Sequence, residues 1–105
     1  MESLKNKKVR LSSEQILFIK ELAKKYFSSD DVRIFGSRAQ ITKKGGDIDI
    51  YIQTEKSKDI LKNKILFLTE FQKKFGIQKI DLVVEYKGAQ FNSVFEEAKR
   101  EGVKL

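Results

Sequence analysis

The chain has no cysteine and no histidine, and these two absences narrow the chemistry that it can perform. Without cysteine it has neither disulfide bonds nor a thiolate nucleophile, and nothing points to secretion. Without histidine it has no imidazole general base, no serine triad of the usual kind and no typical zinc site. Any chemistry must therefore rely on carboxylates, hydroxyl groups and cationic side chains.

Long apolar runs are absent as well. No stretch approaches the ~20 residues that a membrane-spanning helix needs, and the N-terminus has no signal-type apolar segment. We therefore expect a cytoplasmic protein with no membrane partner. The 105 residues, 40% hydrophobic and 35% charged, suit one globular domain over residues 1–105, with residues 1–10 as a flexible lead-in.

The net charge of +7 raises the question of a nucleic-acid partner. The lysines, however, are scattered along the chain rather than gathered in one stripe. A nucleotide or an acidic protein would be attracted equally well, because a basic balance reports steering and not specificity. A small nucleic-acid-binding domain therefore stays as a weaker alternative, and we do not expect nucleic acid to be the partner.

Hydrophobic periodicity predicts an α/β protein of the α+β kind, a small mixed sheet with helices packed on it. Ser12 and Gln15 have the spacing of a capping box at the start of a helix over 13–27. Strands are expected over 32–35, 47–52 and 79–85. A brief helical turn is expected at 37–40, followed by a glycine-containing loop near 43–46.

Two further helices are predicted between and after these strands. Ser57 is expected to cap the first of them, which should end near Phe75 with Gly76 just beyond it. Its inward positions are predicted to include Leu61 and Ile65. The last helix is predicted over about 91–100, with Phe91, Val94, Phe95 and Ala98 packed inward.

Two carboxylates alternate on the clearest predicted strand. Asp47 and Asp49 lie on one face, roughly 6–7 Å apart, and Ile48, Ile50 and Ile52 form the opposite core face. Tyr51 shares the carboxylate face, where we expect a plain edge position. Like charges at this spacing are costly to ionise unless a cation lies between them.

The third strand adds a carboxylate with matching parity. If the second and third strands are neighbours, their apolar faces coincide and Asp81 falls on the same side as Asp47 and Asp49. Hard oxygen ligands held in this way suit one or two Mg²⁺ ions. The alternative is that these residues are simply solvent-facing positions of half-exposed strands.

The segment Gly36-Ser37-Arg38-Ala39 follows the first predicted strand, and nine residues separate Ser37 from Asp47. Glycine lets backbone N–H groups approach an anion, and the start of a short helix offers unsatisfied donors. Together with the carboxylates, this turn indicates a site for a metal-bound nucleotide.

This combination of motifs resembles the polymerase-beta-like nucleotidyltransferase superfamily, over roughly residues 12–100. Within it, the Gly36–Ala39 segment resembles the minimal nucleotidyltransferases, which are often paired with helical HEPN-domain proteins in toxin–antitoxin operons. The resemblance implies that Gly36, Ser37 and Arg38 bind the nucleotide. It also implies that three carboxylates bind Mg²⁺ and are catalytic, namely Asp47, Asp49 and Asp81.

The activity that the resemblance implies is transfer of a nucleoside monophosphate, AMP from ATP, to a hydroxyl group of a partner protein. The partner would be a HEPN-like helical toxin and this chain its antitoxin, with a homo-oligomer or the separate subunit completing the site. The alternative is an antitoxin that binds its partner without catalysis and whose nucleotide site is decayed or regulatory. The segment from Ser37 to Asp47, shorter than is common in the family, favours that alternative.

Overall fold

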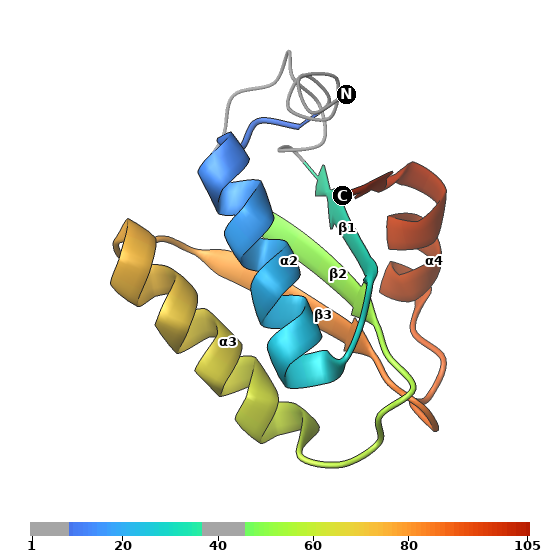
Figure 1. The fold of residues 1–105 in the computed structure, drawn as a ribbon. Coiled ribbons are helices and arrows are strands. Elements are labelled where there is room, and N and C mark those ends of the chain that lie inside the picture. Colours follow the sequence, from blue (N-terminus) through green and yellow to red (C-terminus); the bar gives the residue numbers. More distant parts are fainter. Residues whose placement is uncertain (1–8, 37–45) are drawn as a thin grey trace.

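The computed structural model describes residues 9–36 and 46–105, so the expectations for residues 1–8, for the helical turn at 37–40 and for the loop at 43–45 lie outside the described residues. The helices and strands of the described chain follow the order α-β-β-α-β-α-β (Figure 1). Their bounds are α2 Ser13–Phe27, β1 Asp31–Phe35, β2 Ile48–Gln53, α3 Ile60–Phe75, β3 Ile80–Glu85, α4 Ser93–Glu101 and β4 Val103–Lys104. The predicted mixed α/β architecture is confirmed.

The sheet has four strands in the order β3-β2-β1-β4. Strand β2 runs parallel to β3 and antiparallel to β1, and β1 is antiparallel to β4. The parallel pair is joined by α3, as a parallel connection requires a crossover. Because of these directions, the end of β1 and the starts of β2 and β3 lie at the same edge of the sheet.

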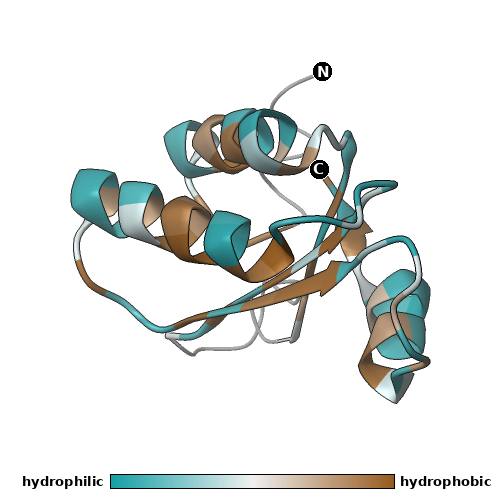
Figure 2. Ribbon diagram, turned by 90° about the horizontal axis from the view of Figure 1, so that it is seen from below, coloured by the Kyte–Doolittle hydropathy of each residue, from teal (hydrophilic) through white to brown (hydrophobic). Residues whose placement is uncertain are grey.

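The two faces of the sheet are covered differently. Helices α2 and α3 lie side by side over one face, while α4 lies against the other (Figures 1 and 2). The main apolar cluster fills the space under α2 and α3 and includes Ile34, Ile50, Phe67 and Phe71. A smaller cluster lies under α4 and consists of Phe35, Tyr51, Phe95 and Ala98. Side chains alternate between these two clusters along β1, β2 and β3, as the period of a strand requires.

The start of α2 confirms the predicted capping box. The Gln15 backbone N–H donates to Ser12 Oγ, and the Ser12 backbone N–H donates to Gln15 Oε1, both over 3.0 Å. The helix contacts α3 through tilted aromatic pairs such as Phe18–Phe71, with ring centroids 6.4 Å apart. The outward side of the same junction carries the ion pair of Lys25 and Glu70.

Helix α3 differs from the prediction at its start and in its buried face. It begins at Ile60, so the residue at the N-cap position is Asp59 and not the predicted Ser57. Asp59 has a left-handed backbone (φ 58°), and its side chain makes no capping hydrogen bond. Leu61 and Ile65 are exposed by 70% and 55%, not inward. Phe67 and Phe71 face the sheet and α2, and this orientation of the helix places Leu61 and Ile65 on the outer surface. Gly76 ends the helix at φ 93°, as predicted.

The C-terminal region also departs from the prediction. Helix α4 begins at Ser93, capped by the Asn92 side chain, and Phe91 before it is 80% exposed instead of packed inward. Phe95 and Ala98 are buried as expected. The short strand β4, which adds an edge beside β1, was not predicted. Within residues 9–36 and 46–105, no helix combines the length and apolar character needed to cross a membrane.

Candidate functional site

The carboxylates of β2 and β3 lie side by side. Asp49 and Asp81 are register partners in the parallel pair, so their side chains leave the same face of adjacent strands. Asp47 immediately precedes β2, and its Oδ2 lies 3.7 Å from the Nζ of Lys79, which precedes β3. The parity predicted from the sequence is therefore observed. Asp49 is partly buried, whereas Asp47 and Asp81 are exposed.

Asp47, Asp49 and Asp81 are called the acidic row below. Asp49 is the most buried of the three. Burial raises the pKa of the Asp49 carboxyl above its ordinary value, and the charges of Asp81, Asp47 and Glu97 raise it further. Lys79 acts in the opposite direction. The row thus concentrates negative charge around a carboxylate that is partly removed from water.

Gly36 closes the row from the end of β1. Its φ of 72° lies in the left-handed region, which glycine adopts without strain. A Cβ on this residue would overlap Asp49 Oδ2 and lie 3.1 Å from Asp49 Cγ. Glycine at this position therefore lets the backbone pass directly against the partly buried Asp49 carboxylate, in addition to allowing the positive φ.

The remaining nucleotide-binding residues expected from the sequence, Ser37 and Arg38, lie outside the described residues. Gly36 is therefore the part of that turn whose position is known. It follows β1 directly, at the edge where β2 and β3 start. Gly36 and the acidic row thus lie at one edge of the sheet.

Tyr51, on the same face as Asp49, is not the edge residue that we expected. It is fully buried in the cluster under α4, because β2 is an inner strand and α4 covers this part of its second face. Its hydroxyl donates to Glu85 Oε1 over 2.5 Å, and Lys99 Nζ lies 3.4 Å from the same oxygen. Burial, followed by the hydrogen bond to Glu85, raises the pKa of the Tyr51 hydroxyl.

Sequence reasoning missed two charged residues near the acidic row. Glu97 lies on α4, and nothing in the sequence around it indicates that its charge would raise the pKa of Asp49. Lys79 could have been found, because it stands two residues before Asp81 and therefore shares its face. Both residues are distant from β2 in the sequence and come near its start only in the folded protein.

The donor set suits Mg²⁺, since carboxylate oxygens are hard ligands and this ion usually takes one or two of them together with substrate phosphates. The repulsion that raises the pKa of Asp49 is the kind that a divalent cation relieves. Over residues 9–36 and 46–105, no group of three or more acidic or other ligating side chains could hold a metal ion alone. A cation bound by the row would therefore need further ligands, such as the phosphate oxygens of a substrate.

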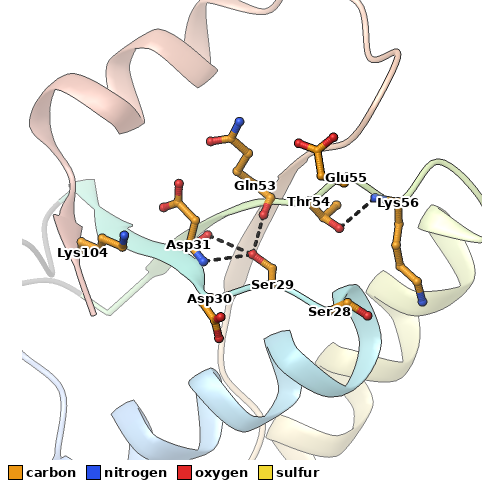
Figure 3. Close-up of a pocket in the computed structure, with 9 residues that line it drawn as sticks. All are labelled: Ser28, Ser29, Asp30, Asp31, Gln53, Thr54, Glu55, Lys56 and Lys104. Carbon is orange, nitrogen blue, oxygen red and sulfur yellow. Dashed lines mark hydrogen bonds between the residues drawn. The ribbon is translucent and has the colours of Figure 1, made fainter.

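A separate pocket of about 330 Å³ lies at the opposite end of β1 and β2 (Figure 3). Ser29 Oγ accepts from the Asp31 backbone N–H and donates to the Gln53 carbonyl oxygen. Thr54 Oγ1 donates to the Phe27 carbonyl oxygen over 2.5 Å. These hydroxyl groups hydrogen-bond the end of α2 and the segment that follows it to the ends of the strands. We therefore assign the residues lining this pocket a structural role.

Comparison with known proteins gives one family. The family of nucleotidyltransferase domains matches residues 14–105, which spans every helix and strand described above except the first residue of α2. No curated protein matches the chain in sequence. The matched region includes the acidic row, Gly36 and Lys79.

Proposed function

Because the chain belongs to the nucleotidyltransferase domain family, and so is a nucleotidyltransferase that takes a nucleoside triphosphate, we propose that it transfers AMP from ATP to a hydroxyl group of a partner protein with Mg²⁺ as cofactor. The register of Asp49 with Asp81 is the observation that carries this proposal. It sets two hard-oxygen ligands on one face, beside a glycine turn suited to a phosphate chain.

In the proposed reaction, the oxygen of the acceptor hydroxyl attacks the α-phosphorus of ATP. A new bond forms between these atoms as the bond to the bridging oxygen of the β-phosphate breaks, and pyrophosphate leaves. The hydroxyl proton passes to the Asp81 carboxylate. Mg²⁺, held by Asp47, Asp49 and Asp81 together with phosphate oxygens of the substrate, would neutralise charge on the phosphates and lower the pKa of the attacking hydroxyl.

The protein contributes mainly position and charge to such a transfer. Gly36 allows the backbone to approach the phosphates, and Ser37 and Arg38 would supply further contacts. The partly buried Asp49 carboxylate lies against the Gly36 backbone, which restricts the space open to it. A ligand restricted in this way loses little entropy when substrate binds.

For the acceptor, we propose a HEPN-like helical protein that this chain silences as an antitoxin. The Gly36–Ala39 segment, with its resemblance to the minimal nucleotidyltransferases, supports this choice. The exposed Leu61 and Ile65, one turn apart on α3, are consistent with a protein partner, because such apolar surface is usually covered in a complex.

The test follows label from the α-phosphate of ATP in the presence of Mg²⁺ and a purified HEPN-like helical protein. Wild type and the control Asp30→Asn, which changes an exposed carboxylate at the far end of β1, should label the partner and release pyrophosphate. Asp49→Asn and Asp81→Asn should not. If the partner is bound and silenced without label, even by Asp47→Asn/Asp49→Asn, catalysis is excluded and the chain is a binding antitoxin.

A further inference from the structure

Lys79 stands opposite Asp47 at the start of the parallel strand pair. Ile48 and Ile80 are register partners, and the Ile48 backbone N–H donates to the Lys79 carbonyl oxygen over 3.1 Å. This bond fixes the backbone of Lys79 two positions before Asp81, which pairs with Asp49. The lysine side chain therefore starts from a rigid point beside the acidic row.

The side chain of Lys79 is held far less firmly than its backbone. Its Nζ lies 3.7 Å from Asp47 Oδ2, which is longer than a direct hydrogen bond. The two side chains are 74% and 52% exposed, and exposed pairs of this kind add little stability. A long, flexible lysine stem can therefore leave Asp47 for another anion at small cost.

The electrostatic surroundings favour such an exchange. Among the described residues, Lys79 is a cationic side chain that counteracts the acidic neighbours of Asp49. A cation shared by the carboxylates would supply the charge that Asp47 receives from Lys79. The ammonium group would then be available to phosphate oxygens that enter the same row, and lysine is a common ligand of phosphate as a point charge.

We propose that Lys79 binds the phosphate chain of the nucleoside triphosphate, exchanging its ion pair with Asp47 for phosphate oxygens; this role rests on the proposed function. Lys79 is a binding residue and takes no part in proton transfer. Its position is set by the first hydrogen bond between β2 and β3, so the same strand pairing that aligns Asp49 with Asp81 also aligns a cation for their substrate.

The experiment measures binding and not turnover. Wild type, Lys79→Met, Lys79→Arg and the control Lys62→Met are titrated by calorimetry with an ATP analogue carrying a methylene group between the α- and β-phosphates, in Mg²⁺. Inorganic triphosphate is titrated in parallel. Lys62→Met also removes one positive charge, but from an exposed position on α3, which covers the opposite face of the sheet.

We expect Lys79→Met to weaken the binding of both ligands about tenfold, which is the effect of losing one hydrogen bond to a charged group. Lys79→Arg should recover most of this affinity, Lys62→Met should match wild type, and all melting temperatures should agree. Equal binding by Lys79→Met and Lys62→Met would overturn the role of Lys79 alone. A loss confined to the ATP analogue would overturn the assignment to phosphate. Absence of binding by wild type would overturn the proposed function and this role together.

Discussion

Asp49 and Asp81 lie directly opposite each other across the parallel strands β2 and β3. Adjacent strands are roughly 4.8 Å apart, so two carboxylates face the same side at a distance where their charges repel. A folded protein carries such a pair at the expense of stability, and sites of this kind are a common origin of the opposition between stability and activity. The first prediction follows from this relationship.

Asp49→Asn should make the protein more stable and less active. The raised pKa of Asp49 means that its contribution to stability is complete below the pKa of the unfolded carboxyl and is lost as pH rises through the folded pKa. At pH 7 the amide avoids that loss, so the melting temperature should rise, whereas nucleotidyl transfer should fall at least about 100-fold. Thermal unfolding at pH 7 and pH 4 checks the first part.

The rise in melting temperature should shrink at the lower pH, where the wild-type carboxyl becomes protonated. Asp30→Asn is the control, since this exposed residue lies at the other end of β1. A melting temperature of Asp49→Asn that is lower than wild type at pH 7 would mean that the carboxylate is satisfied by its surroundings, contrary to this account.

Gly36→Ala should destabilise the protein and disturb Asp49. The alanine must adopt a φ of 72°, which costs about 1–2 kcal/mol, and its Cβ would also overlap the Asp49 carboxylate. Gly88→Ala is a matched control, because Gly88 has a φ of 90° but no neighbour within 4 Å of the added atom. Denaturant unfolding should show the larger loss for Gly36→Ala. Equal losses would leave backbone strain as the whole effect.

Tyr51→Phe should lower stability by about 1 kcal/mol at neutral pH, because the hydrogen bond to Glu85 is lost. Burial and that hydrogen bond raise the pKa of Tyr51, whereas an unfolded tyrosine ionises near pH ~10. The stability contributed by protonated Tyr51 is therefore present below pH ~10 and declines above it. Urea unfolding between pH ~9 and ~11 should show a flatter decline for Tyr51→Phe than for the exposed control Tyr86→Phe.

Glu70→Gln should affect the acid side of the stability profile. Hydrogen bonds from the Tyr26 hydroxyl and the Lys25 ammonium group lower the pKa of Glu70. The carboxylate thus contributes stability above its unfolded pKa, near ~4.3, and loses it as pH falls through the folded pKa. The variant should be less stable at pH 7 but lose less on acidification. An unchanged acid profile, equal to that of Glu21→Gln on exposed α2, would contradict this coupling of α2 to α3.

The sequence was most informative where one local rule decided the outcome. Alternation on β2 and β3 assigned Ile50 and Leu82 to the core and Asp49 and Asp81 to the other face, because the period of a strand leaves no other choice. The capping box at Ser12 is equally local. The faces of α3 were harder to assign, since apolar residues surround the helix and packing against α2 determined which of them are buried.

What could not be predicted depends on contacts distant in the sequence. Tyr51 is buried because β2 is an inner strand that α4 covers, and neither fact is encoded near residue 51. Strand β4, two residues long, has too little pattern to recognise. Glu97 acts on the acidic row only through the placement of α4, so no pattern in the sequence assigned its charge there. Lys79 is different, because its spacing of two residues before Asp81 could have identified it.

The separation of the interior into two apolar clusters has a consequence for native-state hydrogen exchange. The larger cluster joins α2 and α3 to the sheet, whereas α4 is held by the small cluster around Tyr51 and Phe95. Segments that bury less apolar surface open in partial unfolding events, so backbone amides of α4 should exchange before those of β2. Such an opening removes α4 while the α2–α3 layer persists. The acidic face can thus be uncovered at a lower free energy than global unfolding requires.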